Sequence, residues 1–306
     1  MRPLKTRMDV RLAAVLLAAC AVFASTADAA PADTYLDHVN AVRAKRLASL
    51  TRPDGWLSLV GLHFLQPGTS TIGTAADNQI VLAAGPAHFG TVKLAPDGSV
   101  TYTPTPGLNA MIDGKPAHAA ELQLENGDAP PTLVSWDSAS FFVIDRGGRR
   151  ALRVKDSASP RRLRFPGLAY FPVDPSWRIE ARWVPFEAPR HIPITNILGN
   201  VSSEQVTGRA VFERGGKTYE LTPILEGPDD PLFFIVADAT SGESTYEMRF
   251  LYADPPRDGK LVLDFNLAVN PPCAFTPFAT CPLPPKGNRL ELAITAGEKR
   301  FAGSEK

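Results

Sequence analysis

The sequence predicts a mainly β protein: an N-terminal helix, a small β-sandwich, and then an antiparallel β-barrel or sandwich with a disulfide-stapled, proline-rich loop. Three observations predict this. Short apolar runs of strand length recur along most of the 306 residues, whereas a convincing helical spacing occurs once. Turn dipeptides such as Asp97-Gly98 and Asp113-Gly114 separate these runs. Glycine and proline, at 23 and 29 residues, are frequent enough to supply many turns.

Residues 1–30 have the organisation of a secretory signal peptide. Basic residues come first, an apolar run of about 13 residues follows, and Ala27-Asp28-Ala29 offers a cleavage site. Because the run is shorter than the roughly 20 residues that cross a bilayer, we expect export to the periplasm or beyond. Cleavage near Ala30 is favoured, and lipidation at Cys20 is the alternative. The mature chain holds no further apolar stretch of membrane-spanning length.

Residues 31–55 are expected to form a helix and a closing turn. Apolar residues recur there at three- and four-residue spacing, at Tyr35, Leu36, Val39, Val42, Leu47 and Leu50. This spacing leaves Arg43, Lys45 and Arg46 for the outer, solvated face. Pro53-Asp54-Gly55 supplies the turn that ends the helix.

Residues 56–146 are expected to form the small β-sandwich. Their landmarks follow the order Ile72-Gly73, Asn78 to Leu82, His88, Asp97-Gly98, Ile112 to Gly114, Leu124 to Asp128 and Phe141 to Ile144. This order resembles a forkhead-associated domain. The resemblance implies the sandwich but not phosphopeptide binding, because Thr74 stands where that family has its phosphothreonine-reading arginine. Pro86-Ala87 likewise replaces the family's Ser-Arg pair.

The expected second domain, residues 147–306, begins in a basic segment. Residues 146–165 hold eight arginines and lysines, which suits a solvated connector or an exposed hairpin. An anion site is the alternative, because guanidinium groups bind carboxylate and phosphate well. Strand-length runs then continue to the C-terminus, as expected for an antiparallel barrel or sandwich.

Charge and motif content exclude several classes of function. Lys+Arg and Asp+Glu both total 32, so the chain lacks the basic excess of a nucleic-acid-binding protein. The HExxH, GxSxG, CxxC and GxGxxG patterns do not occur. We therefore predict no cofactor and no metal site.

Residues 270–290 concentrate proline around two cysteines, Cys273 and Cys281. A cysteine pair in an oxidising compartment predicts a disulfide. Proline disfavours helix and sheet, so a stiff, stapled loop between two strands is expected. A soft-metal site is the weaker alternative, because no histidine or CxxC spacing accompanies the two thiols.

The C-terminal half resembles the DUF1684 family of bacterial and archaeal proteins. The most specific residues are Asp264-Phe265-Asn266, Asn270 to Phe275, Cys281 to Pro285, Asn288-Arg289-Leu290 and Ala296 to Lys299. Earlier matches are Pro53 to Leu57, Gly167 to Pro172 and Asp174 to Arg178. The chain departs from the pattern at Val269, where the family suggests a tyrosine. The resemblance implies no settled activity, so the residues themselves must indicate the function.

Polar residues around the proline-rich loop are the candidate site: Glu243, Tyr246, Arg249, Asp264, Asn266, Asn270 and Asn288. Strand alternation would turn Asp264 and Asn266 to one face, with Arg249 as their partner. Such groups can bind a small polar or anionic ligand. They can equally organise the loop, because Asx side chains bond nearby backbone groups.

We therefore expect an envelope module that binds a small polar ligand or an envelope protein, with no nucleic acid. One alternative is a hydrolase with Asp264 or Glu243 as general base and Arg249 stabilising an anion. The other alternative is a structural envelope protein. The oligomeric state does not follow from the sequence.

Overall fold

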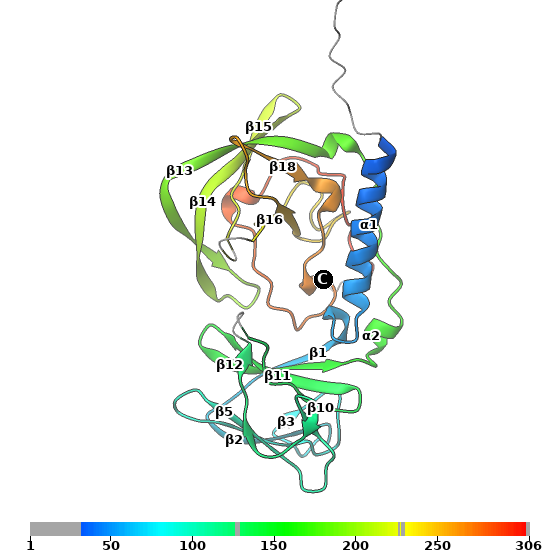
Figure 1. Ribbon diagram of the computed structural model, residues 1–306, viewed down its shortest axis with the longest axis vertical. Helices are drawn as coiled ribbons and strands as arrows, with labels where there is room; N and C mark the ends of the chain where they lie inside the picture. Colours follow the sequence, from blue (N-terminus) through cyan, green and yellow to red (C-terminus); the bar gives the residue numbers. More distant parts are fainter. Residues whose placement is uncertain (1–31, 126–128, 226, 228–229, 304–306) are drawn as a thin grey trace, which may run out of the picture.

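The computed structural model describes residues 32–125, 129–225, 227 and 230–303. The predicted signal peptide and the lipidation alternative at Cys20 lie outside the described residues. In the described part, no helix combines the length and the apolarity needed to cross a membrane. Figure 1 shows two lobes, a β-sandwich and a half-barrel, with one long helix lying along the half-barrel.

The sandwich uses strands β1 (Leu59–Phe64), β2 (Gly68–Gly73), β3 (Ile80–Val81), β4 (Gly90–Leu94), β5 (Val100–Pro104), β6 (Met111–Ile112), β7 (Lys115–Pro116), β8 (Ala120–Glu121), β9 (Leu124–Glu125), β10 (Val134–Trp136), β11 (Ala139–Arg146) and β12 (Arg149–Asp156). Among the described residues, one sheet has the order β1-β12-β11-β10-β6-β7, with β9 beside β11, and the other has the order β3-β2-β4-β5-β8. A shared core lies between them, in which the rings of Phe89, Tyr102 and Phe141 meet edge to face.

The basic segment is not a solvated connector. Its residues 149–156 form β12, which pairs with β11 along its whole length and with β1 from Ala151 to Lys155. Leu152 and Val154 point into the sandwich core, whereas Ala151 packs with Phe142 on the opposite face of the sheet. The expected division at residue 147 therefore falls inside a hairpin, and the sandwich continues to Asp156.

The half-barrel is built around a long hairpin. Strand β13 (Arg178–Thr195) pairs with β14 (Val201–Arg214), and β15 (Lys217–Leu221) and β18 (Lys260–Asp264) extend the sheet on its two sides. A register shift between Pro185 and Arg190 bends β13. The described part of the chain adds a two-stranded sheet, β16 (Leu232–Val236) with β17 (Arg249–Ala253), which packs into the same core.

Helix α1 (Ala32–Thr51) occupies the predicted place but turns the unexpected face inward. Leu36 and Leu47 are exposed at 42% and 39%, whereas Arg43 and Arg46 bind the half-barrel. Arg46 Nε lies 3.0 Å from the fully buried Glu298 carboxylate. The expected outer position of the two arginines was wrong, because ion pairs and hydrogen bonds, rather than an apolar stripe, fasten much of this helix.

The proline-rich loop contains single turns at η4 (Pro272–Ala274) and η5 (Lys286–Asn288) instead of longer elements. Cys273 and Cys281 lie side by side as free thiols, so the predicted disulfide is not formed in this structure. The backbone N–H of Cys273 donates to Cys281 Sγ at 3.1 Å. Backbone bonds such as the one from Ala274 to Pro271 shape the loop without a covalent staple.

Candidate anion-binding site

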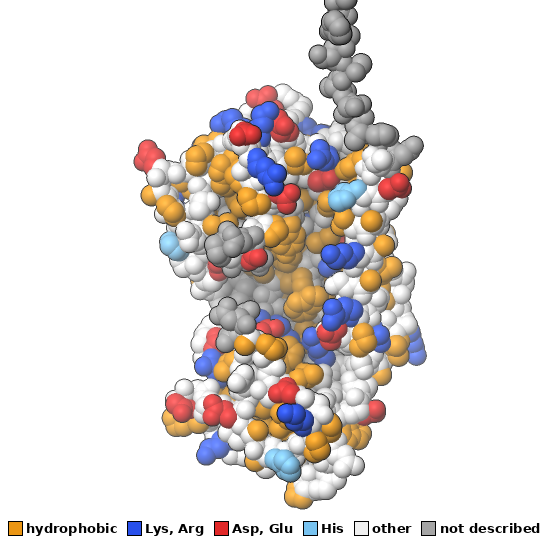
Figure 2. All heavy atoms as spheres, viewed as in Figure 1, with side chains coloured by type: hydrophobic (Ala, Val, Ile, Leu, Met, Phe, Trp, Pro, Cys, Tyr) orange, Lys and Arg blue, Asp and Glu red, His pale blue; other side chains and the backbone are white. Residues whose placement is uncertain are grey.

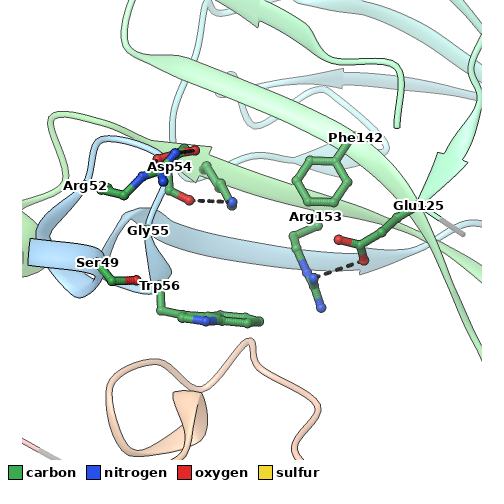
Figure 3. A pocket seen from close by; sticks show the side chains of 9 residues that line it. Ser49, Arg52, Asp54, Gly55, Trp56, Glu125, Phe142 and Arg153 are labelled. Atoms are coloured by element: carbon green, nitrogen blue, oxygen red, sulfur yellow. Dashed lines mark hydrogen bonds and ion pairs between the residues drawn. The ribbon is translucent and has the colours of Figure 1, made fainter. Parts of the chain in front are cut away.

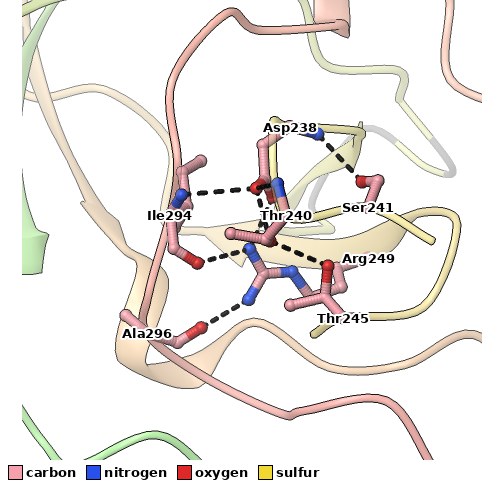
Figure 4. Close-up of polar contacts among 7 residues, drawn as sticks. All are labelled: Asp238, Thr240, Ser241, Thr245, Arg249, Ile294 and Ala296. Atoms are coloured by element: carbon pink, nitrogen blue, oxygen red, sulfur yellow. Dashed lines mark hydrogen bonds and ion pairs between the residues drawn. The ribbon is translucent and has the colours of Figure 1, made fainter. Parts of the chain in front are cut away.

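Arg249 is part of the interior of the half-barrel and does not line a ligand pocket. It is 2% exposed, and its guanidinium donates to Asp238 Oδ2 at 2.6 Å, to the Ile294 carbonyl at 3.0 Å and to the Ala296 carbonyl (Figure 4). Thr240 donates to the other Asp238 oxygen through its N–H and hydroxyl, at 2.8 and 2.5 Å. Burial lowers the pKa of Arg249, and the charge of Asp238 opposes this shift. The pair ties the C-terminal segment to β17.

Asp264 and Asn266 meet as predicted, but through a tight turn and not through strand alternation. Strand β18 ends at Asp264, and the Asn266 N–H bonds back to its carboxylate at 3.1 Å. The Tyr35 hydroxyl donates to both Asp264 oxygens at 2.9 Å, and Asn266 Nδ2 donates to that hydroxyl at 3.0 Å. Burial and the Asp264 carboxylate raise the pKa of Tyr35, so the hydroxyl stays protonated. This cluster fastens α1 to the half-barrel.

Asn270 and Asn288 hold backbone in place. Asn270 Nδ2 donates to the Lys299 carbonyl at 2.8 Å. Asn288 is 1% exposed; its Oδ1 accepts from the Thr222 N–H at 2.9 Å, and its Nδ2 donates to the carbonyls of Thr222 and Ile235 at 2.8 and 3.0 Å. Both side chains thus organise backbone, but the groups they bind lie 29 to 66 residues away and are not the neighbouring groups of a local Asx motif.

The structure does not bring the predicted site residues into one pocket. Glu243 is exposed, and the Tyr246 hydroxyl donates to the Cys273 carbonyl at 3.3 Å. Arg249 is bonded to Asp238, whereas Asp264 is bonded to Tyr35. The organiser interpretation therefore describes most of the set.

Asp264 borders an open groove of about 830 Å³. Charged groups on the groove wall face one another, as in the contact of Lys260 Nζ with Glu180 at 2.6 Å and of Arg178 Nε with Asp264 at 4.0 Å. Among the described residues that line this groove, no buried side-chain nitrogen or oxygen lacks a partner. The groove is thus lined by balanced and largely exposed charges, and its described buried polar atoms already have hydrogen-bond partners.

A second pocket opens where the two lobes meet, in the part of the surface that is hollowed between them (Figure 2). Its volume is about 290 Å³. The end of α1, the turn that follows it, and the outer face of β11 and β12 supply its walls (Figure 3). The lining residues are Ser49, Arg52, Asp54, Gly55, Trp56, Glu125, Phe142, Arg153 and Lys155.

Arg153 is the distinctive group of this pocket. It is 4% exposed, and its guanidinium carbon lies 5.4 Å from the ring centre of Trp56 and 5.8 Å from that of Phe142. Its Nη1 lies 3.3 Å from Glu125 Oε2, and its buried Nε has no hydrogen-bond partner. Burial and the neighbouring Arg146 lower the pKa of Arg153 to about 10, so the group remains cationic near neutral pH.

Glu125 is a weak counterion for Arg153. Its side chain is 37% exposed, and it also faces Arg146, whose Nη2 lies 3.6 Å from the same oxygen. One half-exposed carboxylate therefore serves two guanidinium groups. A buried charge is costly unless it is paired and hydrogen-bonded, so this arrangement leaves Arg153 short of negative charge.

Lys155 adds a second cation to the pocket. Its ammonium donates to the Asp54 carbonyl at 2.6 Å and lies 5.4 Å from the ring centre of Phe142. Burial lowers the pKa of Lys155. Arg52 is exposed and already paired with the Asp54 carboxylate, at 2.9 and 2.8 Å. Three cations and two carboxylates line the pocket, so its formal charge is positive.

Part of the evidence for this pocket was already present in the sequence. The basic segment 146–165 includes Arg153 and Lys155, and an anion site was the alternative interpretation of that segment. Reading the segment as a strand would have placed both residues on one face, because their spacing is two. Trp56 and Glu125 lie far from them along the chain, and nothing in the sequence placed these two residues beside Arg153.

Comparison with known proteins adds a family but no activity. Residues 163–299 match the model of a family described as protein of unknown function, DUF1684. The solution NMR structure of an uncharacterized protein from Haloarcula marismortui shares 32% sequence identity, over 46% of this chain and 80% of that one. The chain belongs to the DUF1684 family. The TM-score of that match is 0.40. No curated protein matches this DUF1684 member.

The matched region and the pocket occupy different parts of this DUF1684 protein. Arg249 and Asn288 and their bonding partners lie inside residues 163–299, and Asp264 lies there too, although its partner Tyr35 does not. Trp56 and Arg153 lie before the matched region. Val269, where the resemblance expects a tyrosine, pairs through its backbone with Phe250 and borders a cavity of only about 10 Å³.

Proposed function

We propose that this protein is an exported binding module that holds a small anionic ligand in the pocket around Arg153. The observation that carries this proposal is the buried guanidinium, whose Nε lacks a partner and whose carboxylate neighbour is shared. A ligand carboxylate or phosphate would supply both the missing charge and the missing acceptor. Charge-assisted bonds of this kind are about twice as strong as neutral ones.

The walls support a ligand with an apolar body. Trp56 and Phe142 flank the guanidinium, and Lys155 stands over the Phe142 ring. A volume of about 290 Å³ lies at the small end of the range of ligand pockets. The proposal is therefore a metabolite-sized anion, and neither nucleic acid nor a long peptide.

Two expectations from the sequence are part of the proposal. Residues 1–30 would export the chain, by cleavage near Ala30 or, in the alternative, with a lipid on Cys20. In an oxidising compartment Cys273 and Cys281 would then become a disulfide, since their groups already touch. The described half-barrel would carry this bond within its proline-rich loop.

The hydrolase alternative receives less support. Its proposed anion stabiliser, Arg249, already donates hydrogen bonds to Asp238 and to two backbone carbonyls. Its proposed base Glu243 is exposed, and Asp264 is held by Tyr35. The purely structural alternative predicts that no small anion binds at Arg153.

Calorimetric titration with sodium acetate, benzoate and phosphate tests the proposal. We expect at least one of these anions to bind the wild-type chain. Arg153→Met should weaken binding by about 10- to 100-fold, since a hydrogen bond to a charged group contributes about 1.5–3 kcal/mol. Its fold should persist, because methionine replaces a poorly compensated buried charge.

Arg149→Met is the matched control. Arg149 is on the same strand and the same face as Arg153, but it stacks on Phe64 at 4.0 Å outside the pocket. Its replacement should leave affinity unchanged. Equal affinities of the two variants, or no binding of any of the three anions, would contradict the proposal.

A further inference from the structure

The two cysteines differ in their access to solvent. Cys273 is half-buried and lines a pocket of about 400 Å³, together with Tyr246, Phe275, Ile197 and Arg161. Cys281 is 4% exposed and belongs to the apolar cluster beneath the loop. A small molecule in the pocket therefore contacts Cys273, whereas Cys281 is covered.

Their hydrogen bonds reinforce this difference. The bond from the Cys281 thiol lowers the pKa of Cys273, and the Tyr246 hydroxyl lowers it further against the effect of burial. The same contact with Cys273, together with burial, raises the pKa of Cys281. Because the thiolate is the nucleophile, Cys273 is the more reactive sulfur of the two.

We propose that Cys273 and Cys281 form a thiol–disulfide exchange site, in which Cys273 reacts with a small external disulfide and Cys281 resolves the product. The Cys273 thiolate attacks one sulfur of the disulfide, a mixed disulfide forms, and one small thiolate leaves. Cys281 then loses its proton and attacks the Cys273 sulfur, and the second small thiolate leaves. The two cysteines are oxidised by two electrons, and the external disulfide is reduced to two thiols.

The positions of the two sulfurs suit this sequence of steps. The Cys273 N–H already lies 3.1 Å from Cys281 Sγ, so the resolving sulfur needs little movement. Arg161 on the pocket wall is a cation that would favour an anionic disulfide. The inference stands apart from the anion pocket at Arg153 and does not require that pocket to be occupied.

Glutathione disulfide, a small anionic disulfide, is the probe. The full chain, carrying Cys20→Ser so that the loop pair alone reacts, is reduced, freed of reductant and mixed with the probe. Peptide mapping by mass spectrometry then follows the products. We expect the parent to end as the Cys273–Cys281 disulfide without retained glutathione. Cys281→Ser should accumulate glutathione on Cys273, and Cys273→Ser should react at least about tenfold more slowly.

Acid quenching of the parent at early times gives the same information without a substitution in the loop. The mixed disulfide should appear on the peptide that contains Cys273. Its appearance on Cys281, equal reaction rates of the two serine variants, or lasting glutathione on both cysteines of the parent would overturn the inference.

Discussion

Replacing Arg249 by methionine should strongly destabilise the half-barrel. The substitution removes a guanidinium that is 2% exposed and leaves the Asp238 carboxylate, whose side chain is fully buried, without its cation. It also leaves the carbonyls of Ile294 and Ala296 without a donor. Thr240 keeps two bonds to Asp238, which moderates the loss.

The expected loss is about 3–5 kcal/mol of unfolding free energy, which is the usual cost of removing one partner of a buried ion pair. Urea unfolding, followed by circular dichroism, measures it. Arg178→Met is the matched control: its side chain is 52% exposed and lies 4.0 Å from Asp264, so its loss should stay below about 1 kcal/mol.

A double variant, Asp238→Asn with Arg249→Met, separates the ion pair from the packing around it. Because no uncompensated charge remains, it should be more stable than Arg249→Met alone. If Arg249→Met lowers the unfolding free energy no more than Arg178→Met does, then Arg249 does not organise the half-barrel. The interpretation of the buried polar cluster as structural would then be wrong.

Three further predictions concern single side chains. Asn288→Ala should lower the unfolding free energy, measured in urea, by about 2–4 kcal/mol, because it removes the bonds of the buried Asn288 side chain to the partly buried backbone of Thr222 and the buried carbonyl of Ile235. A loss below that of the exposed-site variant Lys286→Ala would contradict this. Burial lowers the pKa of His63 below its usual value of about 6.5, so the unfolded chain binds more protons and the folded state loses stability on acidification. His63→Phe should flatten this loss of stability between about pH 7 and pH 5, and the same substitution at the exposed His191 is the control. Trp56→Ala should weaken benzoate binding more than phosphate binding, as titration would show, if the indole contacts the apolar part of the ligand; equal losses would argue against that contact.

Local patterns predicted several elements well. The three- and four-residue spacing before Pro53 predicted α1, and glycine-containing turn dipeptides marked hairpins, because both signals depend on residues that are neighbours in the chain. The same spacing misplaced Arg43 and Arg46. Their partners, Phe171 and Glu298, lie more than a hundred residues away and outweigh the weak amphipathic pattern.

The candidate site shows the same contrast between what local sequence predicts and what long-range contacts decide. The sequence singled out the polar residues around the proline-rich loop. Arg249, Asp264, Asn266, Asn270 and Asn288 are indeed buried and bonded, whereas Tyr246 is half-buried and Glu243 is exposed. It did not reveal that Arg249 takes Asp238 as its partner, while Asp264 takes Tyr35. A carboxylate binds whichever donor the fold places beside it, and sequence distance carries no information on that choice.

By itself, the sequence determined the mainly β composition, the single long helix, the stiff loop around Cys273 and Cys281, and the excess of cations in residues 146–165. Only the tertiary structure decided that β12 lies within the sandwich and that its outer face carries Arg153 towards Trp56. The physical reason is that short-range propensities fix backbone conformation. Burial of a charge, and hence its demand for a partner, arises only when distant segments pack around it.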